Sequence, residues 1–511
     1  MQKTILITGA TDGIGLELAR LYKQQGERPL LLGRREWAAL AHLNKEFDEA
    51  DYCQADLSRS DSAEIVHQFL QDRAIQQLDL IVHNAGVGYY GTIADQSAES
   101  INQLVDVNLV APIALTQMLR PFLPAQGGQV TFISSIAAYL PAPDYAVYVA
   151  TKAALDDFAR NLRIEWGDSV TVQSIHPGAT RTGMHAKMGI SAETMNWQKF
   201  PAAEKVAAQI AKAIDGKRPS PAVGLSNKVL GVVGRNLGGV IDRVMQRQQP
   251  QPKGDGSPSA QKLCVITGAA DGIGKALAQR YASAGYQVVG IDIDAERAAQ
   301  VANDNISFVI GDLSSAEGVQ AILESLSQPI DVLIHNAGIS AVGRFENVPI
   351  GKQRKVLDIN LRAPLLLTAG LLAKGLFRPN TSLIFISSLS KQVSYPGAVV
   401  YAASKAGLAA YARTLRVAFG GHRHVLTVYP GPTRTAHARR YSPDNSRESR
   451  RMSPEQLADL IFQAARKQRP QLIPGVGNRV FATVGQLAPP LTNRLMKKLM
   501  LDSLEDQILV E

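Results

Sequence analysis

One glycine-rich turn occurs twice in this chain of 511 residues, and each copy lies between a short apolar run and a helical pattern. Glycines allow a tight turn and let backbone N–H groups approach an anion at the start of a helix, where the helix dipole favours negative charge. Strand, turn and helix in this order predict a pyrophosphate-binding unit at the first strand of a parallel sheet. The turns are Gly9-Ala-Thr-Asp-Gly13-Ile14-Gly15 and, 259 residues later, Gly268-Ala-Ala-Asp-Gly272-Ile273-Gly274.

Other motifs recur after each turn in the same order, so the two halves are predicted to be one fold repeated with small insertions and deletions. The length supports this interpretation, because 511 residues exceed what one core usually holds. A run rich in Pro, Gly, Gln and Ser separates the halves and is typical of a linker. We therefore predict an α/β protein with two Rossmann-type, doubly wound parallel-sheet domains in tandem, at residues 1–248 and 262–511, joined by the linker 249–261.

Composition excludes several classes of protein. Apolar residues make up 45% and charged residues 19% of the chain, as in ordinary globular proteins. The two cysteines, Cys53 and Cys264, form neither a disulfide framework nor a metal cluster, which suits a reducing cytoplasm. No signal sequence and no uninterrupted apolar stretch of spanning length is apparent, so we expect a cytoplasmic protein. The net charge of +9 permits anionic substrates or an anionic membrane surface, but no motif for nucleic acid is present.

The two halves differ where an adenosine ribose is expected. In the first half, Gly33-Arg34-Arg35 ends the second strand, and arginine can accept a ribose 2′-phosphate. In the second half, Asp292 stands at the position of Gly33, counted from the last turn glycine, and a carboxylate binds the ribose hydroxyls and repels a phosphate. The pattern predicts NADP(H) in domain 1 and NAD(H) in domain 2. A solvated arginine pair is the alternative, and Asp12 counts against the phosphate.

A tyrosine and a lysine four residues apart also occur in each half, with a serine thirteen residues before the tyrosine. On a helix, the two side chains leave the same face one turn apart. A nearby ammonium favours the phenolate, which lowers the tyrosine pKa toward a value useful for acid–base chemistry. Strand end, loop and helix then converge on one point. The residues are Ser135, Tyr148 and Lys152 in the first half and Ser388, Tyr401 and Lys405 in the second.

Together with Asn-Ala-Gly, a lone asparagine and Pro-Gly motifs, these residues make both halves resemble the short-chain dehydrogenase/reductase family. The resemblance implies NAD(P)-dependent hydride transfer without a metal. Tyr148 and Tyr401 would be the general acid or base, Ser135 and Ser388 would bind the reacting oxygen, Lys152 and Lys405 would bind the nicotinamide ribose, and Asn108 and Asn360 would hold a relay water. We expect cofactor contacts from Gly9, Gly13, Ile14, Gly15, Arg34, Arg35, Asp56, Leu57, Asn84, Gly86, Lys152, Pro177, Gly178, Thr180 and Thr182, and from Gly268, Gly272, Ile273, Gly274, Asp292, Asp312, Leu313, Asn336, Gly338, Lys405, Pro430, Gly431, Thr433 and Thr435.

Three further segments stand out. Large apolar residues follow Thr182 and suggest a lid over an apolar substrate or, alternatively, a packed loop helix. Basic residues crowd the loop 437–451, as in a solvated loop or a contact with a phosphate-bearing substrate. The basic amphipathic stretches 225–247 and 480–501 could pack on their own domains, form an interface or lie on lipid. The apolar lid residues are Met184, Met188, Met195, Trp197 and Phe200, and the stripe of the second tail is 480, 484, 487, 491, 495 and 499.

The most specific hypothesis is a bifunctional oxidoreductase that acts on a hydrophobic, lipid-like or steroid-like ketone or alcohol. Domain 1 would be an NADPH-preferring reductase and domain 2 an NAD-preferring dehydrogenase. The alternatives are two independent activities fused for dimerisation, and a cofactor-binding scaffold without turnover. The expected partners are a small carbonyl or alcohol substrate, a peripheral membrane surface, and either a second copy of the chain or its own other half as an internal pseudo-dimer.

Overall fold

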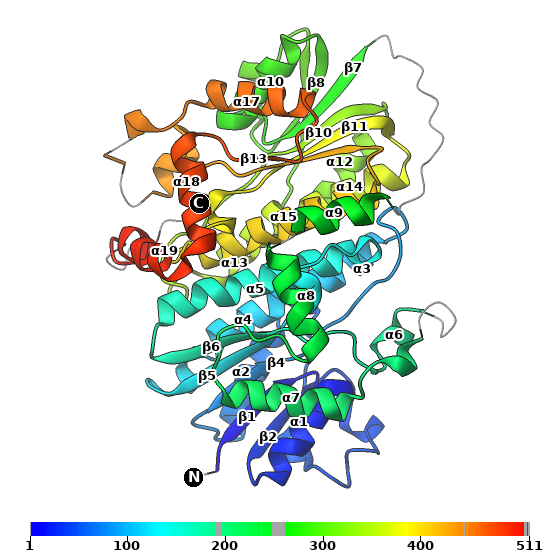
Figure 1. The fold of residues 1–511 in the computed structure, drawn as a ribbon, viewed down its shortest axis with the longest axis vertical. Helices are drawn as coiled ribbons and strands as arrows, with labels where there is room; N and C mark the ends of the chain where they lie inside the picture. The colour runs from blue at the N-terminus through cyan, green and yellow to red at the C-terminus, as the bar shows by residue number, and fades with distance from the viewer. Residues whose placement is uncertain are drawn as a thin grey trace. The chain divides into compact units, whose positions relative to one another are not determined.

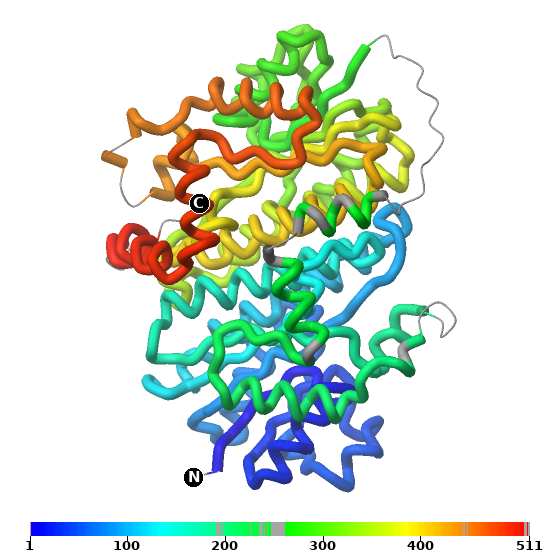
Figure 2. Tube along the Cα trace, viewed as in Figure 1, coloured from blue at the N-terminus to red at the C-terminus, as the bar shows by residue number. Residues whose placement is uncertain are grey.

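The computed structural model of the protein describes residues 2–190, 196–236, 238–247, 261–442, 445–446, 448–504 and 508. By packing, the chain forms two units, which Figures 1 and 2 trace from blue to red. The first comprises Met1–Gly91, Asn102–Leu140 and Val147–Gly238, and the second comprises Thr92–Ile101, Pro141–Ala146 and Gly239–Glu511. Nearly all of the predicted linker lies outside the described residues. Met195 and the side chain of Trp197 also lie outside them.

The first sheet has six parallel strands in the order β3-β2-β1-β4-β5-β6. The chain winds outward from β1 in one direction and then from β4 in the other, so the order reverses between β1 and β4. Ligands of such sheets bind outside the carboxyl ends of the strands at this switch point. The strands are β1 (Thr4–Thr8), β2 (Arg28–Gly33), β3 (Tyr52–Gln54), β4 (Leu80–His83), β5 (Gly128–Ile133) and β6 (Val170–Ile175).

Helices cover both faces of this sheet because the strands are apolar on both sides. Ile5 and Ile7 of β1 share a buried cluster with Leu18 of the first helix and with Val206 and Ile210 of the seventh. The helices are α1 (Gly13–Gln24), α2 (Ser62–Asp72), α3 (Ala98–Val105), α4 (Ala111–Met118), α5 (Ala146–Trp166), α6 (Met184–Lys187), α7 (Ala203–Asp215) and α8 (Leu225–Asn236), with a π-helical turn, η3 (Asp106–Val110), between α3 and α4. The next helix in the chain, α9 (Gly238–Arg247), belongs to the second unit from Gly239 onward.

The second sheet repeats this plan with seven parallel strands in the order β13-β12-β11-β10-β7-β8-β9. Its switch point lies between β7 and β10. Two parallel α/β sheets confirm the predicted fold class of two Rossmann-type domains in tandem. The strands are β7 (Lys262–Thr267), β8 (Tyr286–Asp292), β9 (Ile306–Ile310), β10 (Ile330–His335), β11 (Phe377–Ile386), β12 (His424–Val428) and β13 (Gln471–Leu472).

The helices around the second sheet follow the same sequence pattern. Cys264 and Ile266 of β7 are fully buried against Leu277 of the helix after the glycine turn and Ile461 of the helix before β13. The helices are α10 (Gly272–Ala282), α11 (Ala295–Val301), α12 (Ala316–Ser325), α13 (Ile350–Leu357), α14 (Ala363–Ala373), α15 (Val399–Ala418), α16 (Ala436–Arg440), α17 (Pro454–Arg466), α18 (Val476–Leu487) and α19 (Pro489–Met496), with π-helical turns η8 (Asp358–Arg362) and η11 (Lys497–Leu501).

One helical segment, Ile350–Ala373, is long and apolar enough to cross a membrane by length and composition alone, with a mean hydropathy of 1.5 over its most apolar window. Charged residues such as Asp358 and Arg362 lie within it, so it is not the uninterrupted apolar stretch whose absence the sequence analysis expected. Of that window, 67% is buried inside the fold, as is usual for the core helix of a sheet. Among the described residues, no other helix meets the same limits.

Candidate active sites

Each glycine turn is shaped by close approaches that only glycine allows. Gly9 has φ +64°, and a Cβ atom there would lie 2.9 Å from the Cα of Ala85. A Cβ on Gly15 would lie 2.3 Å from the carbonyl oxygen of Gly9. Gly268 (φ +66°) and Gly274 meet the same limits in the second turn, where the Gly274 Cβ would lie 1.8 Å from the Gly268 oxygen. At the start of helices α1 and α10, both turns therefore present backbone without side chains, which suits the binding of a pyrophosphate.

The Asn-Ala-Gly motifs hold these turns in place. Asn84 donates from Nδ2 to the carbonyl oxygens of Thr8 at 3.0 Å and Gly9 at 3.3 Å. Asn336 does the same for Thr267 and Gly268, at 3.0 Å each. The predicted asparagines thus hold the glycine turns in place through hydrogen bonds to the backbone at the start of each turn. The motif glycines stand closer to the reacting groups, since a Cβ on Gly86 would lie 3.3 Å from Lys152 Nζ, and one on Gly338 would lie 2.9 Å from Lys405 Nζ.

At the first ribose position, Arg34 and Arg35 are exposed just beyond β2. Arg35 donates to the carbonyl oxygen of Thr11 at 3.3 Å, which holds it beside the glycine turn. A Cβ on Gly33 would lie 2.5 Å from Thr11 Cγ2, so this position leaves no room for a side chain. Asp12, which counted against a phosphate, is paired with Lys187 at 2.9 Å. Its negative charge is thereby partly balanced.

At the second ribose position, Asp292 ends β8 and is fixed by backbone donors. Its Oδ2 accepts from the N–H of Ala270 at 2.8 Å, and its Oδ1 accepts from the N–H of Asp294 at 3.2 Å. The carboxylate is therefore oriented toward the glycine turn and is half-buried. The next residue, Ile293, is 62% exposed and occupies the position of Arg34.

The aspartates after the third strands of both sheets are also oriented by local contacts. Asp56 accepts from the N–H of Ser58 at 2.9 Å and Asp312 from that of Ser314 at 2.7 Å. The Ser58 backbone hydrogen bond holds the pKa of Asp56 below its ordinary value. Leu57 is buried beside it, and Leu313 is half-buried. Both pairs lie at the carboxyl edge of their sheets, where an adenine ring would be expected.

Ser135, Tyr148 and Lys152 converge at the carboxyl ends of β4 and β5. Ser135 follows β5 and hydrogen-bonds the Tyr148 hydroxyl. Lys152 is 3% exposed, and its Nζ lies 5.8 Å from the centre of the Tyr148 ring and donates to the Ile133 carbonyl at 3.0 Å. In the second site, Ser388 hydrogen-bonds Tyr401, and Lys405 Nζ lies 5.9 Å from the Tyr401 ring and 3.1 Å from the Ile386 carbonyl. The two trios have the same geometry.

The expected fall in the tyrosine pKa is not found in the free protein. Burial raises the pKa of Tyr148 and of Tyr401, and the serine hydrogen bonds only oppose that rise. Burial also lowers the pKa of Lys152 and Lys405 to about 8. Desolvation therefore dominates at both groups. In each pair, burial thus favours the neutral tyrosine and the neutral lysine over their charged forms.

Asn108 and Asn360 lie in the π-helical turns η3 and η8, a local structure that is often found at functional sites. Asn108 is fully buried and exchanges two 2.9 Å hydrogen bonds with the backbone of Val87, directly after the Asn-Ala-Gly motif. Its Nδ2 also donates to Thr151 Oγ1, next to Lys152, at 3.2 Å. Asn360 makes the same contacts with Ile339 and, at 3.0 Å, with Ser404.

The Pro-Gly loops join the serine loops to the glycine turns. The N–H of Ile136 donates to Pro177 and that of Leu389 to Pro430, at 3.0 Å in each case. Thr180 and Thr433 donate to the carbonyls of Gly178 and Gly431. The methyl groups of Thr182 and Thr435 would lie 3.1 and 3.2 Å from a Cβ on Gly13 and Gly272. In each site, the serine loop, the Pro-Gly loop and the glycine turn are thus in contact with one another.

The apolar walls beside the two tyrosines differ. In the first site, the Met188 sulfur would lie 2.4 Å from a Cβ on Gly88, so this predicted lid residue covers the loop after Asn-Ala-Gly. Phe200 lies 5.6 Å from His185, which is buried. In the second site, Tyr401 packs against a cluster formed by Val342, Ala398, Tyr441 and Leu504, with Tyr395 beside it.

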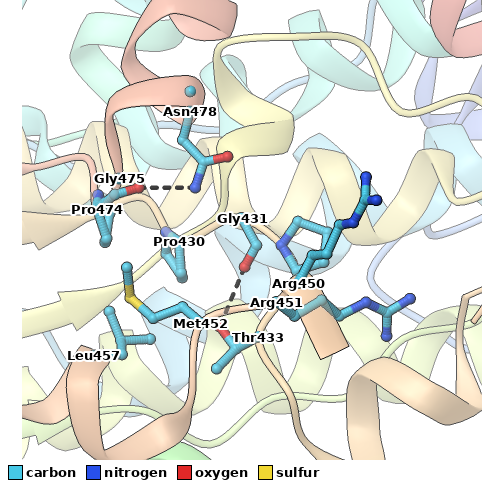
Figure 3. A pocket seen from close by; sticks show the side chains of 12 residues that line it. Pro430, Gly431, Thr433, Arg450, Arg451, Met452, Leu457, Pro474, Gly475 and Asn478 are labelled. Carbon is cyan, nitrogen blue, oxygen red and sulfur yellow. Dashed lines mark hydrogen bonds between the residues drawn. The ribbon is translucent and has the colours of Figure 1, made fainter. Parts of the chain in front are cut away.

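A pocket of about 420 Å³ is lined in part by Pro430, Gly431 and Thr433 of the predicted cofactor edge. Figure 3 shows Asn478 on one side, directed toward the backbone of Pro474, and the side chains of Arg450 and Arg451 on the other. Of the other basic residues in this loop, Arg439 pairs with Glu448 at 2.7 Å, and Arg447 lies outside the described residues. His437 of α16 keeps exposed surface, and desolvation by the protein around it, with a smaller effect of the Lys405 charge, lowers its pKa to about 4.

Sequence reasoning missed three supporting residues in each site. Ser134 and Ser387 donate to the carbonyls of Lys152 and Lys405, and the hydroxyls of Thr151 and Ser404 accept from the π-turn asparagines. Asn227 and Asn478 lie against the Pro-Gly loops, where a Cβ on Gly178 or Gly431 would approach their amides within 2.5 and 2.7 Å. Each occurs at matching positions in both halves, so a comparison of the halves would have found them. His83 and His335 are buried, hydrogen-bonded to threonines and stacked on phenylalanines, which makes them structural.

Known proteins resemble each half of the chain. A family model described as short chain dehydrogenase matches residues 3–192 and 262–446. Dehydrogenase/reductase SDR family member 7B of Rattus norvegicus is 29% identical over 224 residues, which cover 41% of this chain and 67% of that protein. Serine 3-dehydrogenase of Agrobacterium fabrum is 36% identical over 187 residues, which cover 36% of this chain and 74% of that protein.

A solved structure also resembles the chain over most of its length. The NADP-bound N-domain of a bacterial malonyl-CoA reductase has a TM-score of 0.60 at 17% identity, and the match covers 86% of this chain and 93% of that one. At this identity the likeness supports the fold alone. Since the family model matches most of the chain, once over each sheet, the protein belongs to the short-chain dehydrogenase family and is an NAD(P)-dependent oxidoreductase with two consecutive domains of that family.

Proposed function

We propose that the protein is a bifunctional oxidoreductase in which the first domain reduces a carbonyl with NADPH and the second oxidises an alcohol with NAD. The observation that carries this proposal is the exchange at the ribose position. Exposed Arg34 and Arg35 follow Gly33 in one site, and the fixed carboxylate of Asp292 stands in the other. Everything else in the two cofactor edges is nearly the same.

The chain's own residues perform the same chemistry in both domains. When bound, the nicotinamide exchanges a hydride with the substrate carbon. Ser135 donates a hydrogen bond to the reacting oxygen, and Tyr148 transfers the proton to that oxygen during reduction. The Nζ atom of Lys152 lies over the Tyr148 ring, 5.8 Å from its centre, and would bind the nicotinamide ribose. In the second domain, Ser388, Tyr401 and Lys405 have these roles, with the proton moving from alcohol to Tyr401 during oxidation.

Charge supports the cofactor assignment. A 2′-phosphate brings about two negative charges, which two guanidinium groups stabilise and a neighbouring carboxylate destabilises. Lys187 pairs with the one acidic residue in the first turn, Asp12, and so reduces its repulsion. Asp292 can accept both ribose hydroxyls while its oxygens remain held by the N–H groups of Ala270 and Asp294. The opposite preferences suit reduction in one domain and oxidation in the other.

The test uses the intact chain with one site silenced at a time. Tyr401→Phe leaves only the first site, which should reduce a hydrophobic ketone with NADPH at least tenfold better than with NADH. Tyr148→Phe leaves only the second site, which should oxidise a secondary alcohol with NAD and not with NADP. Tyr286→Phe, a half-buried tyrosine away from both sites, serves as the control. Equal use of both cofactors by both single-site chains would overturn the proposal.

The same variants separate the alternatives. If the two silenced chains lose activity toward unrelated substrates, the two sites act independently and fusion serves assembly. The mass of the chain in solution would then distinguish a homodimer from a monomer whose halves pair with each other. If no ketone or alcohol is turned over while cofactor still binds, the chain is a scaffold. A shared substrate, made by one site and consumed by the other, supports the coupled redox pair.

We also propose that this is a cytoplasmic protein whose tails touch anionic membranes. Large apolar side chains are exposed along the second tail, including Leu487 (81%), Leu491 (63%) and Leu499 (54%). Arg494, Lys497 and Lys498 lie among them. A basic amphipathic surface of this kind binds anionic lipid. In flotation with phosphatidylserine vesicles, the wild type should float at low salt, and the double variant Leu487→Glu, Leu491→Glu should not. Failure of the wild type to float would end this part of the proposal.

A further inference from the structure

The second tail follows the loop that connects Ser388 to Tyr401. Gly485 of α18 lies against this loop, since a Cβ there would be 2.6 Å from the Gln392 oxygen and from Val393 Cγ1. Asn493 of α19 then accepts a 2.8 Å hydrogen bond from Ser394 Oγ. Helices α18 and α19 of the tail therefore both contact the loop between Ser388 and Tyr401.

The end of this tail is buried beside the catalytic tyrosine. Leu501 is 2% exposed and Leu504 is fully buried. Leu504 belongs to the cluster of Val342, Ala398 and Tyr441 against which Tyr401 packs. Gly397 makes room for it, because a Cβ at Gly397 would lie 2.7 Å from Leu504 Cδ1. The tail thus occupies apolar space next to the phenol that would handle the proton.

This burial is selective. The stripe that the sequence analysis singled out in this tail is mostly exposed, for example Val480 (59%), Leu491 (63%) and Leu495 (44%). The buried side chains are instead Thr492, Met496, Met500, Leu501 and Leu504. The tail therefore packs on its own domain through the face opposite to the predicted stripe, and that face leads to Tyr401.

The first tail begins in the same way and then differs. Gly234 of α8, which corresponds to Gly485, lies against Tyr139 and Leu140 of the first serine loop. The residue that corresponds to Asn493 is Asp242 in α9, and it is buried within the second unit between Arg413 and Arg416 of α15, at 2.8 and 3.1 Å. The position that matches Asn493 is thus held by ion pairs, and the residues that would match 500–504 lie outside the described part of the chain.

We propose that residues 500–504 form the roof of the second substrate pocket and limit that site to small or short-chain secondary alcohols. This inference rests on the proposed function of Tyr401. In the oxidation, the carbinol C–H bond would break, its hydride would pass to NAD, and the hydroxyl proton would pass to the phenolate form of Tyr401, which leaves a ketone. A bulky group on the alcohol would have to enter the space that Leu504 fills. His437 and Tyr441 of α16, whose rings lie 4.8 Å apart, form the facing wall.

The experiment measures kcat/KM of full-length Tyr148→Phe with NAD and a series of 2-alkanols from 2-propanol to 2-decanol. The parent should prefer the short members. Adding Leu504→Ala should raise kcat/KM for 2-octanol and 2-decanol about tenfold or more and leave 2-propanol within about twofold, because space for a few methylenes changes specificity by this factor. Leu499→Ala, in the same tail but 54% exposed, is the matched control and should leave the profile unchanged.

The outcomes are distinguishable. If Leu504→Ala leaves the chain-length profile unchanged while Tyr401→Phe abolishes turnover, the second site works and the roof is wrong. If Leu504→Ala lowers the rate for every alcohol equally while NADH still binds, Leu504 is only structural and the roof is again wrong. If no alcohol is oxidised by the parent and Tyr401→Phe changes nothing, the proposed function itself has failed.

Discussion

The two candidate active sites share the same central residues, here called the frame, and differ in the residues around them, here called the rims. Serine, tyrosine, lysine and π-turn asparagine make the same contacts in both, down to the backbone partners of Asn108 and Asn360. The rims differ at the ribose end, where Gly33 and Arg34 are replaced by Asp292 and Ile293. They differ again at the apolar wall. The comparison teaches that a duplicated frame can keep its contacts while the side chains around it change. Under the proposed function, these changes set the cofactor and substrate of each site.

The difference at the substrate wall runs through several positions. Tyr90 of the first half corresponds to Val342 of the second, and Met184 corresponds to His437. In the loop after Asn-Ala-Gly, the large Tyr90 is thus replaced by the smaller Val342, and the tail residue Leu504 packs in the same cluster as Val342. Each wall is built from a different part of the chain, so each can change without disturbing the trio.

The largest effects should come from the shared frame and be equal in the two sites. Ser135→Ala and Ser388→Ala remove a donor to the reacting oxygen and should each lower kcat of their own site by about 10²–10³-fold. The adjacent serines are matched controls, because Ser134 and Ser387 bond only to the carbonyls of the lysines. Ser134→Ala and Ser387→Ala should cost less than about tenfold. Equal losses from adjacent serines would contradict the assignment.

The buried lysines should weaken the fold in the same pH-dependent way in both domains. Because burial lowers the pKa of Lys152 and Lys405 from 10.5 to about 8, the charged form is penalised in the folded state. The penalty is complete below pH 8 and disappears as the pH rises through the unfolded pKa, since the unfolded chain then binds more protons. Lys405→Met should therefore raise the free energy of unfolding by up to about 3 kcal/mol at pH 7.

That gain should shrink toward zero between pH 8 and 10.5, which denaturant unfolding of variant and wild type at several pH values would measure. Lys467→Met, on the exposed end of α17, should show no such trend. A gain that stays constant with pH would mean that packing and not the buried charge is responsible.

The cofactor preference of the second domain should change when its residues at the ribose position are replaced by those of the first domain. Asp292→Gly with Ile293→Arg copies Gly33-Arg34 and should move its preference from NADH to NADPH by about 10–100-fold, because it removes a repulsive carboxylate and adds a phosphate donor. Ile293 is 62% exposed, so the arginine needs no repacking. Ile65→Arg, on an exposed helix position, is the charge control. An unchanged ratio of KM values for the two cofactors would contradict the role of Asp292.

The reverse exchange should fail for a steric reason. A Cβ on Gly33 would lie 2.5 Å from Thr11 Cγ2, so Gly33→Asp should cost about 1–3 kcal/mol of stability. The residue that corresponds to Thr11 in the second half is Ala270. Adding Thr11→Ala should therefore restore most of the lost melting temperature and allow NADH binding. If Gly33→Asp alone is as stable as the wild type, Thr11 does not restrict the side chain at position 33, and the steric explanation is wrong.

Much of this arrangement could be predicted from the sequence because it depends on local patterns. Strands followed by glycine turns, and the spacing of Ser135, Tyr148 and Lys152, led directly to two parallel sheets with a converged trio at each carboxyl edge. Repetition strengthened each motif, since the same spacing recurs around Tyr401. These features depend on residues that are close in sequence or that the sheet topology brings together.

The rest depended on partners that periodicity does not reveal. A helical stripe marks which residues share a face, but not which face meets the domain, so the exposed Leu491 was singled out and the buried Leu504 was missed. The π-turn at Asn108 arises from contacts with Val87 and Thr151, which are distant in sequence. The tyrosine pKa was expected to fall, but the depth of burial, which only the folded structure shows, raises it.

The most direct test of two differently tuned sites is the binding stoichiometry of NADPH to the intact chain by isothermal titration calorimetry. At micromolar concentration, the wild type should bind one NADPH per chain, and NADH should fill a second, independent site. The Asp292→Gly, Ile293→Arg variant should bind two NADPH per chain. Two equivalent NADPH sites in the wild type, or NADH that displaces all bound NADPH, would contradict the account.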